Sequence, residues 1–189
     1  AALMGKRGVP LAVLDTCMAN ASVQKQLQAM TDDGGKRGVQ GTPTFFIGDR
    51  KLDTNVCAYI ATGVWHHWLC TWDRGFVDHL WPTVQRSLDW VLGMRQPNGA
   101  PLWACTEDER PWDYALLTGS SSISHALRCG AQLAQLINEP RPDWCAAGAL
   151  LADVVANHHD AFENKDRWAM DWYYPVLTGC LTGEQAKTR

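Results

Sequence analysis

The feature that most constrains the fold is a change of residue pattern near residue 52. A β-rich run, Thr44–Ile47, precedes the change, and apolar residues at helical spacing follow it. All 10 Trp, all 4 Tyr and all 6 His come after residue 52. Phe45 and Phe46 are the only aromatic side chains before it. The sequence therefore predicts two segments, residues 1–52 and residues 53–189.

Charge and composition exclude several classes of protein. Residues 1–52 hold 7 Lys and Arg against 4 Asp and Glu, and residues 53–189 hold 10 against 16. Neither balance is extreme, so we expect no nucleic-acid partner. No apolar run reaches the roughly 18 residues of a membrane-spanning helix, and we expect no membrane span.

The cysteines indicate a reducing compartment. There are 7, an odd number, and none forms a Cys-x-x-Cys pair. Most lie in apolar helical patterns, where a free Cys behaves as a small hydrophobic residue. We therefore expect buried thiols, no dithiol redox motif and a cytoplasmic location.

The first segment has a helix-then-hairpin pattern. Val23 and Leu27 are four residues apart between polar residues, which predicts a short amphipathic helix over residues 19–29. Residues 44–47 predict a strand, and the Gly-Asp-Arg that follows is typical of a hairpin turn.

These residues resemble the C-terminal part of the DsbA-type branch of the thioredoxin-like family. The matching features are a lone Cys17, Gly38-Val39 and the motif GTPTFFI at residues 41–47. The resemblance implies a cis-proline loop at Thr42 and Pro43. It covers about 45 residues and includes neither redox cysteine, so we expect a remnant helix and β-hairpin without oxidoreductase activity.

The second segment is predicted to be helical throughout. The first helix should begin with Thr54 as its cap. The predicted helices cover residues 54–72, 76–94, 121–137 and 142–157, with a shorter one from about residue 172 that ends by residue 183. Short and long connections alternate between them, the long ones being residues 97–120 and 158–171, which is typical of helical hairpins laid side by side.

This segment resembles the C-terminal part of actinobacterial (α/α) toroid proteins of the six-hairpin glycosidase superfamily, often labelled prenyltransferase-like. The resemblance rests on TNVCAYIATGVWHHWLCTW (54–72), DYALLTGSSSISHALRC (113–129) and MDWYYPVLTG (170–179). It implies a mainly α fold, an incomplete toroid whose first, third and fifth helices are inner. Because the predicted helices are too few to close a ring, self-association through the open ring is expected.

Toroid topology would gather the loops ahead of the inner helices at one rim, where carboxylates and aromatic rings are mixed. Glycoside hydrolysis needs two carboxyl groups, and sugars stack on aromatic faces. We predict Asp113 and Asp171 as the catalytic pair, with Glu107 as a further candidate. The predicted substrate-binding residues are Asn55, Tyr59, Trp103, Trp112, Tyr114, Trp168, Trp172 and Tyr173.

The expected ligand is a neutral sugar or oligosaccharide, with no cofactor and no metal. The predicted function is that of a carbohydrate-active, glycoside hydrolase-like toroid protein or a fragment of one. Three alternatives stay open: a non-catalytic helical binding or scaffold protein, a prenyltransferase-like or terpene-cyclase-like toroid, and a DsbA-like remnant without redox cysteines. The cyclase alternative is disfavoured because no Asp-x-Asp-Asp acid motif is present.

Overall fold

A computed structural model gives the fold. It describes residues 21–22, 25, 28–29, 31–32, 52–106, 110–165 and 167–188. The chain divides into two compact units, Ala1–Thr44 and Phe45–Arg189. In the first unit, the described residues of the predicted helix over 19–29 are helical. Thr42, Pro43 and the predicted strand over 44–47 lie outside the described residues, and the predicted boundary at residue 52 stays a prediction.

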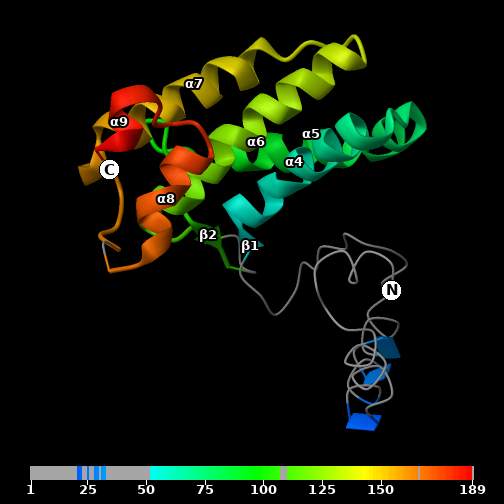
Figure 1. The fold of residues 1–189 in the computed structure, drawn as a ribbon, viewed down its shortest axis with the longest axis horizontal. Helices are drawn as coiled ribbons and strands as arrows, with labels where there is room; N and C mark the ends of the chain where they lie inside the picture. The colour runs from blue at the N-terminus through cyan, green and yellow to red at the C-terminus, as the bar shows by residue number, and fades with distance from the viewer. Residues whose placement is uncertain are drawn as a thin grey trace. The chain divides into compact units, whose positions relative to one another are not determined.

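The second unit is mainly helical and contains one very short sheet (Figure 1). Strand β1 (Leu52–Asp53) pairs antiparallel with β2 (Ala104–Cys105). The helical elements are α4 (Thr54–Thr71), α5 (Arg74–Gly93), α6 (Leu117–Leu136), α7 (Pro142–Asn157), the 3₁₀ turn η1 (His159–Ala161), α8 (Ala169–Leu177) and α9 (Gly183–Lys187).

The predicted helices are all present, and the larger differences are at the N-terminal ends of two of them. Helix α7 has the predicted bounds, and α4 ends one residue early. Helix α6 begins about one turn before the predicted start, and α8 begins at Ala169 rather than near Trp172. The sequence did not predict α9.

Hydroxyl side chains explain the early start of α6 and the position of Thr54. Ser121 and Ser122 donate hydrogen bonds to the carbonyls of Leu117 (2.8 Å) and Thr118 (3.1 Å), so they lie inside α6 rather than before it. The prediction that Thr54 caps α4 was wrong. Asp53 is the N-cap, and the Thr54 hydroxyl lies near the carbonyls of Leu102 (2.9 Å) and Trp103 (2.8 Å) instead.

Helix α6 is the centre of the unit. It contacts α4, α5, α7 and α8, and α4 also packs against α5. Helices α4, α6 and α8 therefore form one row, and α5 and α7 pair with α4 and α6 as two helical hairpins (Figure 1). This arrangement confirms the predicted fold class, the hairpins of an (α/α) toroid.

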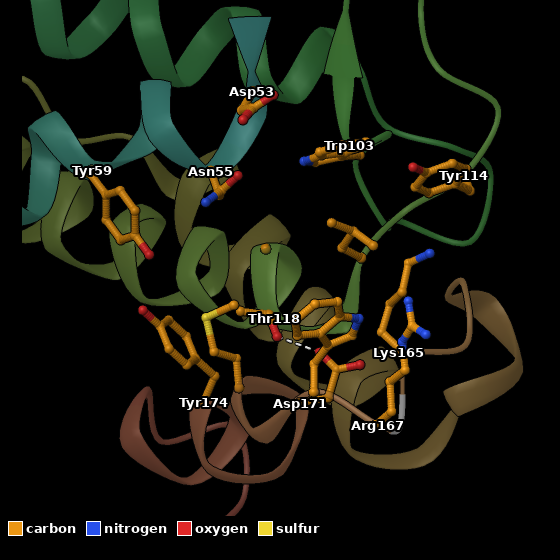
Figure 2. Close-up of a pocket in the computed structure, with 14 residues that line it drawn as sticks. Asp53, Asn55, Tyr59, Trp103, Tyr114, Thr118, Lys165, Arg167, Asp171 and Tyr174 are labelled. Atoms are coloured by element: carbon orange, nitrogen blue, oxygen red, sulfur yellow. Dashed lines mark hydrogen bonds between the residues drawn. The ribbon is translucent and has the colours of Figure 1, made fainter.

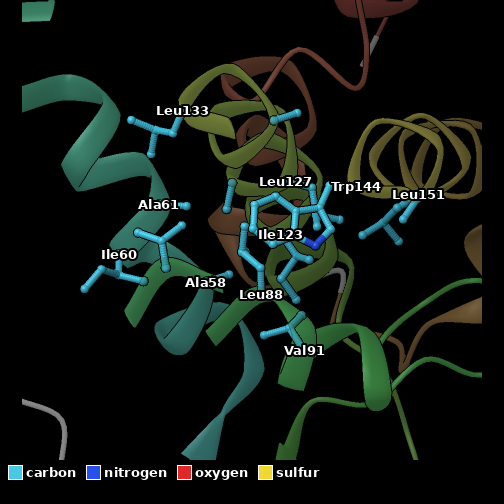
Figure 3. Packing of buried hydrophobic residues seen from close by; sticks show 14 of the residues in the cluster. Ala58, Ile60, Ala61, Leu88, Val91, Ile123, Leu127, Leu133, Trp144 and Leu151 are labelled. Carbon is cyan, nitrogen blue, oxygen red and sulfur yellow. The ribbon is translucent and has the colours of Figure 1, made fainter. Parts of the chain in front are cut away.

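The core lies between α6 and its neighbours (Figure 3). Leu88 of α5, Ile123 and Leu127 of α6, and Trp144 of α7 are among the largest fully buried side chains. Gly130 permits this packing, since a Cβ atom there would overlap Leu88 Cδ1 and lie 3.1 Å from Trp144 Cε3. The inner helices are therefore held in place by close contact with the outer ones.

Two further findings concern membrane-spanning helices and the cysteines. None of the helices in the described part of the chain is long and apolar enough to cross a membrane. The cysteines that the structure describes in the second unit are free thiols, of which Cys70 and Cys145 are exposed.

Candidate functional site

A cavity of about 510 Å³ lies where α4, α6 and α8 begin, within the second unit. Its lining comes from the N-terminal turns of those helices and from the loops that precede them. The lining residues are Asp53, Asn55, Tyr59, Trp103, Tyr114, Leu116, Thr118, Gly119, Lys165, Arg167, Trp168, Met170, Asp171 and Tyr174.

Backbone pairing joins the loop before α6 to the start of α4. Asp53 is paired with Ala104 across the two strands, and the Thr54 amide donates to the Trp103 carbonyl (2.9 Å). The Trp103 amide in turn donates to the Tyr114 carbonyl (2.8 Å). These bonds fix a carboxylate and two aromatic rings on one side of the cavity, although they are far apart in the sequence.

The aromatic rings of that side form a cluster. Trp103 and Tyr114 are stacked with centroids 5.5 Å apart and an interplanar angle of 20°. Trp112 packs against both rings, at 5.1 Å from Trp103 and 5.9 Å from Tyr114, but it does not line the cavity. Trp103 and Tyr114 therefore offer the cavity flat apolar surface of the kind on which a pyranose ring stacks.

Two carboxylates face the cavity from opposite sides (Figure 2). Asp53 comes from the end of β1, and Asp171 comes from the first turn of α8. Asp171 is buried, at 7% exposed, and its Oδ1 accepts a hydrogen bond from the Thr118 hydroxyl of α6. That bond holds one oxygen of Asp171 as an acceptor and fixes its orientation.

Two cations also line the cavity. Lys165 Nζ lies 3.5 Å from Glu163 Oε1 and 5.6 Å from the centroid of the Tyr114 ring. The Arg167 guanidinium lies 5.1 Å from the Trp168 ring centroid. The charged side chains of the described lining, Asp53, Asp171, Lys165 and Arg167, are thus balanced in sign.

A thiol near the site is not suited to nucleophilic chemistry. Burial, together with the charge of Asp53, raises the pKa of the Cys57 thiol to about 11. A thiol must ionise to act as a nucleophile or metal ligand, and Cys57 therefore stays protonated at neutral pH. Across the described ranges, no group of three His, Cys, Asp or Glu side chains is placed to hold a metal ion.

The structure brings many of the predicted site residues together. Asn55, Tyr59, Trp103, Tyr114, Trp168 and Asp171 all line the cavity. Trp112, Trp172 and Tyr173 do not line it, and Asp113 is exposed and also outside the lining. Glu107 lies outside the described residues.

Several lining residues were not predicted. Asp53 was expected on the rim ahead of the first inner helix but was not chosen as a site residue, and its pairing with Ala104 joins it to the loop before α6. Tyr174 has a detectable signal in the sequence, because it lies three residues after Asp171 and therefore on the same helical face. That signal depends on α8 beginning at Ala169.

A second cavity of about 330 Å³ lies farther along α6, between α4 and the C-terminal end of α8. Cys129 Sγ lies 3.5 Å from His125 Nε2 there. Burial raises the pKa of the Cys129 thiol and lowers the pKa of His125, so the neutral thiol and the neutral imidazole are favoured over an activated ion pair.

Comparison with known proteins confirms both resemblances. A thioredoxin family model, described as "Thioredoxin", matches residues 8–58. The helical unit has the fold of an (α/α) toroid, because it superposes with a TM-score of 0.55 on a rhamnosidase from Klebsiella oxytoca with rhamnose bound. That match has 13% sequence identity and covers 78% of this chain and 31% of the rhamnosidase.

One relative in sequence is, by its name, a mannosidase. The chain is 47% identical over 143 residues to the MMP endo-(1,4)-3-O-methyl-alpha-D-mannosidase of Mycolicibacterium hassiacum. The match covers 76% of this chain and 40% of the mannosidase. The chain therefore spans about two fifths of the length of that relative.

Proposed function

We propose that this chain is a glycoside hydrolase-like toroid protein that acts on an α-mannoside in the cavity at the start of α4, α6 and α8. The observation that carries the proposal is the pair of carboxylates, Asp53 and Asp171, on opposite sides of a cavity lined by aromatic rings (Figure 2). Hydrolysis of a glycosidic bond requires two carboxyl groups flanking that bond.

The environments of the carboxylates suggest their roles. Asp171 accepts the Thr118 hydrogen bond and is therefore held as the base or nucleophile. Asp53 faces it across the cavity and is the proposed acid (Figure 2). Asp113, which is exposed, and Glu107, which lies outside the described residues, remain the sequence-based candidates for the second group.

The substrate class comes from the relatives. The mannosidase relative acts, by its name, on 1,4-linked 3-O-methyl-α-mannosides, and it shares nearly half of the aligned residues with this chain. The lining joins polar groups with the apolar side chains of Leu116, Met170 and Trp168, which suits a sugar that carries methyl ethers. We therefore propose a 3-O-methylated or free α-(1→4)-mannoside as the substrate.

The test is release of shorter products from α-(1→4)-linked 3-O-methylmannose oligosaccharides, followed by mass spectrometry. The unmethylated oligosaccharide and an aryl α-rhamnoside serve as comparison substrates. We expect shorter mannosides and no release from the rhamnoside. Saturable binding of the mannosides without any cleavage would favour the non-catalytic alternative, and the absence of both would contradict the proposal.

A further inference from the structure

The side chain of Asn55 brings an amide group to the cavity. Asn55 is the second residue of α4 and lines the cavity, and Figure 2 shows its amide facing the cavity from the side of α4. Within the described part of the chain, no hydrogen bond engages that amide. An uncharged group that can both donate and accept a hydrogen bond is therefore available to a ligand.

Two other uncharged polar side chains of the lining already have partners. The Thr118 hydroxyl donates to Asp171 Oδ1. The Tyr59 hydroxyl lies 3.0 Å from Ser122 Oγ. These hydroxyl groups are held by protein contacts, whereas the Asn55 amide can turn either its oxygen or its nitrogen to a ligand.

The backbone that carries Asn55 is held in place. Asp53 is paired with Ala104 across the two strands, and the Thr54 amide donates to the Trp103 carbonyl at 2.9 Å. The residues that lead into α4 are thus fixed before a ligand binds. Binding through the Asn55 amide requires little further ordering than that of its own side chain.

We propose that the Asn55 amide binds one oxygen of the mannoside and accepts it either as a free hydroxyl or as a methyl ether. A methoxy oxygen can accept a hydrogen bond but has no hydrogen to donate, and the amide nitrogen supplies that hydrogen. A free hydroxyl can be bound by either end of the amide. Asn55 thus lets one cavity bind methylated and free mannosides with similar affinity. The inference rests on the proposed function, because it names a group that contacts the proposed substrate.

Asn55→Asp tests the donor while keeping the shape of the side chain. A carboxylate at neutral pH only accepts hydrogen bonds. A free sugar hydroxyl can still donate to it, whereas a methoxy oxygen would face it without a hydrogen between them. An acidic side chain is favourable in the first turn of a helix, so the variant should keep its fold.

The probes are methyl α-D-mannoside and its 2-, 3-, 4- and 6-O-methyl ethers, with tryptophan fluorescence as the readout, since Trp103 and Trp168 line the cavity. In the unsubstituted protein, the ether at the position that Asn55 contacts should bind within about threefold of the parent sugar. In Asn55→Asp, that ether should bind about tenfold more weakly than the parent sugar. Because both affinities are measured in the same variant, a general effect of the new charge on sugar binding cancels in their ratio.

A second variant and a matched control accompany this test. Asn55→Leu removes both the donor and the acceptor, so the parent sugar and the ether should both bind about tenfold more weakly, with their ratio unchanged. Asn98→Asp is the control for the substitution itself. Asn98 is exposed and does not line the cavity, and its side-chain oxygen accepts from the Ala100 amide at 3.0 Å, which a carboxylate also does. This control should leave every affinity ratio unchanged.

The outcomes separate the inference from the proposed function. If every ether stays within about threefold of the parent sugar in Asn55→Asp, or if Asn55→Leu binds all the sugars as the unsubstituted protein does, the inference is overturned while sugar binding stands. The same holds if the unsubstituted protein already rejects the ether at the affected position. If no sugar of the series binds saturably to the unsubstituted protein, the proposed function fails and the inference fails with it.

Discussion

Replacing Asp171 by Asn is expected to lower the rate of mannoside hydrolysis by about 10²–10⁴-fold, the usual contribution of a general base or acid. The side chain is buried and held by the Thr118 hydroxyl, and an amide of the same shape cannot take up a proton. Asp53→Asn should cause a loss of similar size. Initial rates of oligosaccharide cleavage at fixed protein concentration measure both effects.

Two further variants give the control and distinguish the two candidate pairs of carboxylates. Asp153, whose carboxylate accepts a hydrogen bond from Asn157 on the outer helix α7, provides the matched variant Asp153→Asn, which should keep the rate within about twofold. Asp113→Asn distinguishes the two carboxylate pairs. If Asp113→Asn abolished cleavage and Asp53→Asn did not, the pair predicted from the sequence would replace the pair proposed from the cavity.

Replacing Trp144 by Ala is expected to lower the free energy of unfolding by about 3–5 kcal/mol, the usual cost of truncating a buried aromatic side chain. The Trp144 side chain is fully buried and contacts the Trp81 ring with centroids 5.6 Å apart. Its Nε1 donates to Asp89 Oδ1 at 3.1 Å. The variant thus leaves a cavity between α5, α6 and α7 and removes the hydrogen bond.

Urea unfolding followed by circular dichroism measures this loss. Trp72→Ala is the matched control, because Trp72 is 71% exposed, and it should cost less than about 1 kcal/mol. Equal midpoints for the two variants would contradict the placement of Trp144 in the core.

The sequence predicted the helices well because their apolar periods are long. Helix α7 could be placed at both ends, since Pro142 is suited to the first turn and the apolar stripe stops at Asn157. The start of α6 could not be placed. Ser121 and Ser122 favour a cap in the local sequence, and only tertiary packing decides that they bond to carbonyls within the helix.

The sequence predicted part of the site. The rule that loops before inner helices share a rim predicted the positions of Trp103, Tyr114 and Asp171. Trp172 and Tyr173 were expected there too, but they are 61% and 49% exposed, because a helix that starts at Ala169 presents Asp171 and Tyr174 to the cavity instead. The position of Asp53 at the cavity depends on the long-range pairing of β1 with β2.

Binding of a sugar in the cavity is tested by comparing two ligands. Tryptophan fluorescence is titrated with an α-(1→4)-mannooligosaccharide and, separately, with a prenyl diphosphate, in the unsubstituted protein and in Trp103→Leu. We expect a saturable change with the mannoside that is weakened in Trp103→Leu, and no saturable change with the diphosphate. Saturable quenching by the diphosphate alone would contradict the sugar site and favour the prenyltransferase-like alternative.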